Sequence, residues 1–418
     1  MSAPFLYVFL EINCSTWYSN ANSFGGILMN MLYKDLFSWC DEQFQEQLSL
    51  LKTLAAIPAP SHHEEKRAEF IRDWLIQNGA QNPVIDSAKN VILSLGNTNL
   101  PMFCVMAHTD VVFSDITPLP VREERGLLYA PGVGDDTANV VALMLCCKYF
   151  LRHPEMIPEP FLIVFNSCEE GLGNLKGVRQ VMSDYAGKIH SFVSFDCQSD
   201  SIVTQAVGSE RWKVRVTTRG GHSFSDFGNP SAIAHLSALI GRLYAQNVPH
   251  KENCTTTYNV GLITGGTSVN TIAQSAEMMY EYRSDDRDTM AFMAAQFHRL
   301  LSDANTTGVQ VSSECIGIRP CGGDIPEEEQ RKLLMRCRNA LSAVYPETVP
   351  FCAASTDANI PLSLGIPAAT FGLYRGGGAH TREEYVRIDS LTPGLKVAMA
   401  FFLNVFSSEE SVDFHRCP

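Results

Sequence analysis

The stretch Phe161-Leu-Ile-Val-Phe-Asn-Ser-Cys-Glu-Glu-Gly-Leu-Gly-Asn174 decides how the rest of the chain is organised. Its first five residues, Phe161 to Phe165, are apolar and predict a strand buried on both faces, as in the middle of a parallel sheet. Directly beyond this strand stand two adjacent carboxylates, Glu169 and Glu170. Neighbouring acids repel each other, but a cation can neutralise one while the other carries protons. An isolated Glu-Glu pair is more often a solvated turn, so the interpretation depends on the rest of the chain.

The same arrangement, an apolar strand followed by a ligand-type residue, occurs at three other places. One apolar run ends in His108-Thr-Asp110, a second ends in Asp196, and a third leads into the loop that carries His380. A glycine-rich loop also delivers Asp135 and Asp136 to the start of an apolar helix. In open α/β sheets, ligands collect beyond the carboxyl ends of the strands. We therefore expect one rim of the sheet to hold enough His and carboxylate side chains for two divalent ions.

Length and composition limit the classes of protein. The chain has 418 residues, of which 45% are hydrophobic and 18% charged, and this is typical of a globular protein with room for two domains. The net charge of −13 argues against partners such as nucleic acids or anionic membranes. The thirteen cysteines contain no CxxC pair, and several lie inside apolar runs. They indicate reduced thiols in a cytoplasmic protein rather than a disulfide framework.

The chain divides into segments of different character. Residues 1–31 form an extension without a packing pattern, and its apolar run is too short for a membrane span. Alternating helices and strands over residues 32–207 predict an α/β catalytic domain with a doubly wound, mostly parallel sheet, and the pattern resumes over 316–418. Between them, residues 208–315 read as βαββαβ, which resembles an inserted α+β ferredoxin-like module.

The ordered set of motifs resembles the dinuclear zinc exopeptidases and amidohydrolases, the family of peptidase T, aminoacylase and bacterial glutamate carboxypeptidase. The motifs are His108-x-Asp110, Gly134-Asp-Asp136, Glu169-Glu170-Gly, Asp196, Gly220-Gly-His222-Ser and Gly378-Ala-His380-Thr. Each motif is weak alone, and the ordered set is specific. The resemblance covers about residue 35 to the C-terminus and is strongest to members like peptidase T.

The resemblance implies a role for each matching residue. His108 and Asp196 hold one ion, Glu170 and His380 hold the other, and Asp135 bridges the two. Glu169 is then the general base, Asp110 orients the imidazole of His108, and the Asp135–Asp136 peptide bond is cis. Imidazole and carboxylate ligands suit two Zn²⁺ ions, although Mn²⁺ or Co²⁺ also fit this oxygen-rich set. Two ions roughly 4 Å apart can share and activate a hydroxide and polarise an amide carbonyl.

The inserted segment and the last loops carry further candidates. In the family, the residue matching His222 crosses a dimer interface and stabilises the oxyanion in the partner's site. The resemblance therefore implies a homodimer joined through the inserted segment, which acts as a dimerisation or lid domain. The strand Trp212–Thr218 and the helix Pro230–Gln246 each have an apolar side, and we expect the second chain of the dimer to cover these sides. Candidate substrate-binding residues are Asn270, Arg283, Asp357 and Arg375. Among them Arg283 is equally well explained as a surface charge, and His222 can also be read as a turn residue. Many relatives have Lys after the two acids, whereas this chain has Thr137, which puts substrate preference in doubt rather than activity.

Three functions remain open at this point. The first is a metallo-exopeptidase acting on di- or tripeptides in the manner of an aminopeptidase or tripeptidase, favoured by the stretches around Asn270 and Arg283. The second is a deacylase of N-acyl amino acids on the same scaffold. The third is a binding module without activity, which the complete set of ligands and Glu169 argues against. The sequence leaves the recognised side chain and the physiological metal undecided.

Overall fold

The structure is a computed structural model that describes residues 34–404, so the predicted extension over residues 1–31 lies outside the described residues. Near its start, α2 (Phe44–Ala56) buries Leu50, Leu51 and Leu54 at helical spacing. The helix ends at Ala56, and the capping residue Ile57, directly before Pro58, has an extended backbone. This agrees with the steric clash that disfavours helical backbone directly before proline.

An eight-stranded sheet forms the centre of the molecule in the order β1-β2-β6-β3-β7-β16-β8-β15. The neighbours β6, β3, β7 and β16 run parallel to one another, whereas β2 and β8 run antiparallel to their neighbours in this core. The sheet is therefore mostly parallel, as predicted. The strands in sheet order are β1 (Val84–Ile85), β2 (Val91–Leu95), β6 (Phe161–Asn166), β3 (Met102–His108), β7 (Ile189–Phe195), β16 (Ala368–Phe371), β8 (Ile202–Ala206) and β15 (Phe351–Ala354).

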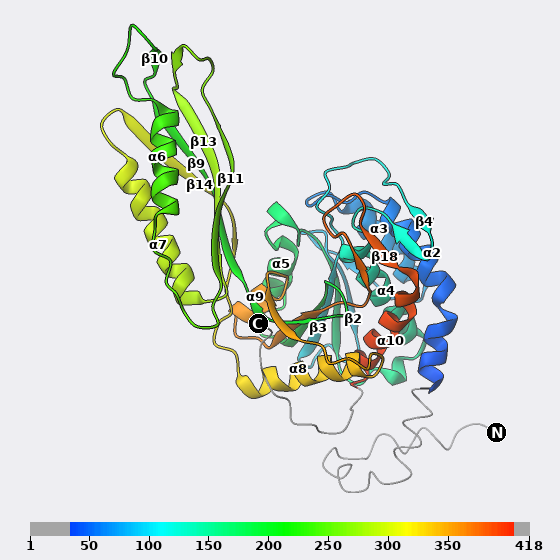
Figure 1. Ribbon diagram of the computed structural model, residues 1–418. Helices are drawn as coiled ribbons and strands as arrows, with labels where there is room; N and C mark the ends of the chain where they lie inside the picture. Colours follow the sequence, from blue (N-terminus) through cyan, green and yellow to red (C-terminus); the bar gives the residue numbers. More distant parts are fainter. Residues whose placement is uncertain (1–33, 405–418) are drawn as a thin grey trace, which may run out of the picture.

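Helices cover both faces of this sheet (Figure 1). Alternate residues of β3 belong to different cores: Phe103 and Val105 pack in one, and Cys104 and Met106 pack in the other. The larger core contains residues of α2, α4 and α10, and the smaller core contains residues of α5 and α9. This division explains why the central strands are apolar throughout instead of alternating. The covering helices are α3 (Glu65–Gln77), α4 (Asn139–Arg152), α5 (Lys176–Asp184), α8 (Glu327–Ser342), α9 (Asn359–Ser363) and α10 (Leu391–Phe402).

A second sheet, of four antiparallel strands, stands apart from the central sheet (Figure 1). Its order is β11-β13-β9-β14, and α6 and α7 pack on one of its faces around a core of their own. This segment comprises β9 (Gly208–Thr218), β10 (Gly221–His222), α6 (Ala232–Tyr244), β11 (Thr256–Gly265), β12 (Thr271–Ile272), β13 (Ser275–Ser284), α7 (Arg287–Ala304) and β14 (Val309–Arg319). We call residues 208–319 the insert.

The packing inside the insert corrects one expectation from the sequence. The sequence predicts that a second chain covers the apolar sides of the strand Trp212–Thr218 and of the helix Pro230–Gln246. That expectation is wrong, because Val214, Leu236 and Leu239 are buried against one another and against α7 within one chain. The strand β9 lies inside the sheet, between β13 and β14, and the edge strands are β11 and β14.

A small four-stranded sheet, not predicted from the sequence, holds the loop that carries His380. The order is β17-β18-β5-β4, with strands β17 (Gly376–Gly377), β18 (Tyr385–Arg387), β5 (Leu127–Tyr129) and β4 (Arg122–Glu124). The loop that carries His380 therefore connects β17 to β18, and β18 pairs with β5.

No helix within residues 34–404 has both the length and the apolar character that crossing a membrane requires. Cys104, Cys146 and Cys147, which the sequence placed in apolar runs, are buried free thiols.

Candidate metal centre and active site

The candidate ligands lie where parallel strands end. His108 is the last residue of β3, Glu169 and Glu170 follow β6, and Asp196 directly follows β7. These three strands are parallel neighbours, so their carboxyl ends share one edge of the sheet. His380 reaches the same edge from the loop between β17 and β18.

A tight turn brings Asp135 to this edge. Gly132 has φ +70, and a Cβ there would lie 2.2 Å from Val111 Cγ1, so the position requires glycine. The Asp135–Asp136 peptide bond is cis, which confirms the prediction. Directly after the turn the chain enters α4, whose apolar residues anchor it in the larger core.

The structure brings the predicted ligands together in two groups that share Asp135. One group is His108, Asp135, Asp136 and Asp196, and the other is Asp135, Glu170 and His380. Within each group the ligand atoms lie within 4.8 Å of one another. Asp135 Oδ1 is 3.1 Å from His108 Nε2, and its Oδ2 is 3.1 Å from His380 Nε2. The two oxygens of one carboxylate thus face different histidines, the arrangement that a bridging ligand needs.

Asp136 belongs to the first group by distance, but its carboxylate has other partners. Oδ2 accepts the backbone N–H of His108 at 2.9 Å, and Oδ1 accepts the side-chain amide of Asn139 at 2.5 Å. The side chain is fully buried. Asp136 therefore acts as a support that fixes β3 against the start of α4.

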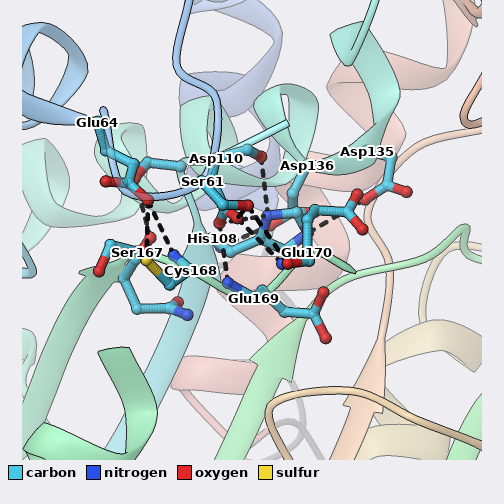
Figure 2. Close-up of polar contacts among 12 residues, drawn as sticks. Ser61, Glu64, His108, Asp110, Asp135, Asp136, Ser167, Cys168, Glu169 and Glu170 are labelled. Atoms are coloured by element: carbon cyan, nitrogen blue, oxygen red, sulfur yellow. Dashed lines mark hydrogen bonds and ion pairs between the residues drawn. The ribbon is translucent and has the colours of Figure 1, made fainter. Parts of the chain in front are cut away.

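Asp110 organises the loop that carries the two glutamates (Figure 2). Its carboxylate accepts the backbone N–H groups of Glu169 and Glu170, each at 3.0 Å, and the hydroxyl of Ser61 at 2.6 Å. His108 Nδ1 lies 3.1 Å from the backbone oxygen of Asp110 and 3.5 Å from its carboxylate. A proton on Nδ1 then points at Asp110, and Nε2 stays free to bind a cation.

Glu169 belongs to neither group of candidate ligands. Its carboxylate points away from the contacts drawn around Glu170, Asp135 and His108 (Figure 2). Oε1 accepts Nη1 of Arg319 at 2.9 Å, and both side chains are almost completely buried. Arg319 was not predicted from the sequence, because nothing near the end of β14 marks it as different from a surface arginine.

Glu384 is a second residue next to the candidate ligands that the sequence did not predict. Its carboxylate accepts the backbone N–H groups of Gly132, Gly134 and Asp135, each at 2.8 Å. The side chain is buried, and burial raises its pKa to about 7. The only signal in the sequence was an acid four residues after His380.

The concentration of buried acids is itself evidence for a cation. Burial raises the pKa of Glu170 to about 7 and that of Asp196 to about 6, and the charge of Asp135 adds to both shifts. For His380, hydrogen bonding to Asp135 and Glu170 raises the pKa to about 10. Without a positive charge these carboxylates are costly to bury ionised. Imidazole Nε2 atoms and carboxylate oxygens are the donors that Zn²⁺, Mn²⁺ and Co²⁺ accept, so the residues present fit divalent ions.

The two candidate site residues at the outer end of the insert, His222 and Asn270, lie away from the candidate metal centre. His222 and Asn270 are exposed, and Figure 1 places β10, which contains His222, at the end of the insert far from the central sheet. The imidazole Nδ1 of His222 accepts the backbone N–H groups of Phe224 and Ser225, at 3.2 and 3.3 Å. Within one chain, neither residue is brought to the candidate metal centre.

The other three predicted substrate-binding residues, Arg283, Asp357 and Arg375, each contact a polar side chain of the same chain. Arg283 pairs with Glu281 on the same strand, at 3.2 Å. Asp357 is fully buried and accepts the amide of Asn166 at 2.6 Å. Arg375 pairs with Glu347 and lies over the ring of Tyr345, 4.2 Å from its centroid. Substrate binding by these residues stays a prediction.

An α/β fold with imidazole and carboxylate donors gathered at the carboxyl ends of its parallel strands is typical of metal-dependent hydrolases. The family model described as peptidase family M20/M25/M40 matches residues 104–404. The chain belongs to this family of hydrolases.

Individual relatives are distant in sequence. The chain is 23% identical over 356 residues to a succinyl-diaminopimelate desuccinylase of Corynebacterium glutamicum, covering 83% of this chain and 93% of that protein. Among solved structures, a tripeptidase from Staphylococcus aureus has a TM-score of 0.69 at 20% identity, over 86% of this chain and 97% of that one. Human carnosine dipeptidase 1 has a TM-score of 0.68 at 16% identity, over 89% and 98%. At these identities the structural likeness establishes the fold.

Proposed function

We propose that this hydrolase is a metal-dependent exopeptidase that cleaves an amide bond of small peptides, with Glu169 as its general base. The observation that carries the proposal is the position of Asp135, whose two oxygens each lie 3.1 Å from a different histidine. His108 and Asp196 would hold one ion, Glu170 and His380 the other, with Asp135 between them. Zn²⁺ is the ion that best suits this mixture of donors.

Each residue has a separate task in the proposed reaction. When bound, the two ions would lower the pKa of a water molecule and polarise the scissile carbonyl. Glu169 lies beside the ligands, and its Oε2 has no hydrogen-bond partner among the described residues, so it can take the proton of the attacking water. The same carboxyl group then passes that proton to the leaving amine. Asp110 holds Glu169 and Glu170 through their backbone N–H groups and keeps the proton of His108 on Nδ1.

The insert would serve as a ferredoxin-like lid and dimerisation domain. The catalytic domain would then comprise residues 32–207 and 320–418, since β14, the last strand of the insert, runs to Arg319 and past the predicted boundary at residue 315. Its strand order, with the first and last strands β9 and β14 adjacent, supports the ferredoxin-like assignment. Within residues 34–404, the edge strand β11 pairs with another strand, β13, on one side only, and Leu262 and Ile263 on it are about half exposed, at 52% and 51%. Pairing two such edges in a two-fold homodimer would cover them and carry each His222 towards the partner's centre.

A deacylase of N-acyl amino acids is the second candidate. The observation that favours it is the similarity to a desuccinylase and to an N-acetyldiaminopimelate deacetylase of a Geobacillus strain, 25% identical over 222 residues. The stretches around Asn270 and Arg283, which resemble peptidase T, favour the peptidase.

One assay distinguishes the candidates. The purified chain would be incubated with Zn²⁺, Mn²⁺ or Co²⁺ and tested on di- and tripeptides with free termini and on N-succinyl and N-acetyl amino acids. We expect the highest kcat/KM on a peptide. A higher value on the acyl amino acids assigns the deacylase, and the absence of turnover with every ion and substrate would leave a binding module.

A further inference from the structure

The general-base candidate is held by a residue from another part of the fold. Arg319 is the last residue of β14 and so belongs to the insert. Its guanidinium donates two hydrogen bonds to Glu169. Nη1 donates to Oε1 at 2.9 Å, and Nη2 donates to the backbone oxygen of Glu169. Nη1 also lies 3.3 Å from both the backbone oxygen and the hydroxyl of Ser355. The planar group is therefore fixed between the end of β15 and the loop that follows β6.

The chain around Arg319 is fixed as well. The backbone N–H of Ile318 donates to Asn174 Oδ1 at 2.9 Å, and Arg179 donates to the backbone oxygen of Ile318 at 2.5 Å. Arg211 of β9 donates to the backbone oxygen of Gly171 at 2.5 Å. These contacts join the base of the insert to the loop that carries both glutamates, so Arg319 has little freedom to move away from Glu169.

The ion pair between Arg319 and Glu169 is buried, unlike an ion pair at the protein surface. The side chain of Arg319 is 5% exposed and that of Glu169 is 7% exposed. A guanidinium group that binds both the carboxylate and the main chain of a glutamate limits the rotamers of that side chain and stabilises its negative charge. With Oε1 bound to Arg319, Oε2 is the oxygen left without a partner among residues 34–404.

We propose that Arg319 is a positioning residue for Glu169: it holds the carboxylate in one orientation, so that Oε2 serves as the proton acceptor. The inference rests on the proposed function, since it takes Glu169 as the general base. It adds that the insert takes part in catalysis within its own chain, through Arg319, in addition to any role of His222 across an interface.

The test is a double-mutant cycle. Arg319→Gln removes the fork, and a misplaced base should lower kcat by about 10- to 100-fold. KM and metal content should change little, because the hydrogen bonds of Arg319 go to Glu169 and Ser355 and not to the candidate ligands. Arg319→Lys keeps the charge but offers a single donor nitrogen in place of the fork, so it should recover part of the lost kcat. In a Glu169→Gln background, Arg319→Gln should cause no further loss, since the group that it positions is already gone.

Arg242→Gln is the matched control. Arg242 also belongs to the insert, on α6, and it pairs with Asp303 at 2.8 Å rather than with Glu169. It should retain the wild-type kcat. If Arg319→Gln does not fold, Arg319→Lys decides, because a lysine with unchanged kcat would show that the fork does not position the base.

The outcomes separate this inference from the proposed function. If Glu169→Gln alone keeps wild-type turnover, the assignment of the base is wrong. If Glu169→Gln is inactive but Arg319→Gln keeps its kcat, raises KM instead, or lowers the rate equally in both backgrounds, only the role of Arg319 is overturned.

Discussion

The carboxylate of Glu384 accepts the backbone N–H of Asp135 at 2.8 Å, although the two residues are 249 positions apart in the chain. Two more N–H groups, of Gly132 and Gly134, donate to the same carboxylate. One buried acid therefore fixes the whole turn that presents the candidate bridging ligand. Outer residues of this kind commonly control how tightly a metal is bound.

Replacing Glu384 by Gln should weaken metal binding. The amide offers one acceptor oxygen and places an NH₂ group against backbone donors, so the turn loses its fit. We expect metal affinity to fall by about 10- to 100-fold, with activity restored by excess ion. Titration of the metal-free protein with Zn²⁺ measures this directly. Glu383→Gln is the control, because Glu383 is exposed and pairs only at the surface, with Arg122 at 3.3 Å; equal affinities for the two variants would contradict the role of Glu384.

The sequence predicted the central strands and the ligands because both depend on local patterns. An apolar run such as Phe161–Phe165 predicts a buried strand, and the residue after it must lie at the edge of the sheet. Glu384 and Arg319 could not be found in this way. Their partners lie 249 and 150 residues away, and only the assembled fold brings them together. The covered apolar faces of the insert were missed for the same reason, since periodicity does not say which helix covers a strand.

Glu169→Gln should leave the metal content near two ions per chain and abolish turnover. The base and ligand roles are separate, because the Glu169 carboxylate contacts Arg319 rather than the histidines. Loss of general-base catalysis costs about 100- to 10,000-fold in rate. Elemental analysis and steady-state kinetics on the same preparation make the comparison. A variant that loses metal along with activity would identify Glu169 as a ligand.

Single ligand substitutions should remove different numbers of ions. His380 belongs to one ligand group only, whereas Asp135 belongs to both. We expect His380→Ala to retain about one ion per chain and Asp135→Asn to retain less than that, since a neutral amide bridges two cations poorly. Mass spectrometry under native conditions counts the ions. If both variants keep the same number, Asp135 is not shared.

Gly394→Ala should destabilise the catalytic domain. Gly394 lies in α10, and a Cβ there would come within 1.4 Å of the backbone oxygen of Leu373, so the helix must move away from the sheet. Forced overpacking of this kind costs about 3 kcal/mol. Gly241→Ala is the control: it lies in α6 with no atom within 4 Å of the added Cβ, and alanine favours helix there by about 1 kcal/mol. Thermal melting should therefore shift in opposite directions, and a Gly394→Ala variant that melts like the wild type would contradict the close packing.

Mixing two inactive variants tests whether His222 serves a partner's site. Within one chain, His222 is exposed, and β10, the strand that contains it, lies at the end of the insert far from the central sheet (Figure 1). In a mixed dimer of Glu169→Gln and His222→Ala chains, one site has an intact Glu169 from its own chain and an intact His222 from the other. We expect activity to return on mixing, up to about half of the wild-type rate per mixed dimer, since one of two sites is complete. Exchange of subunits would be followed with chains of different mass. If exchange is observed and no activity returns, His222 does not act across the interface.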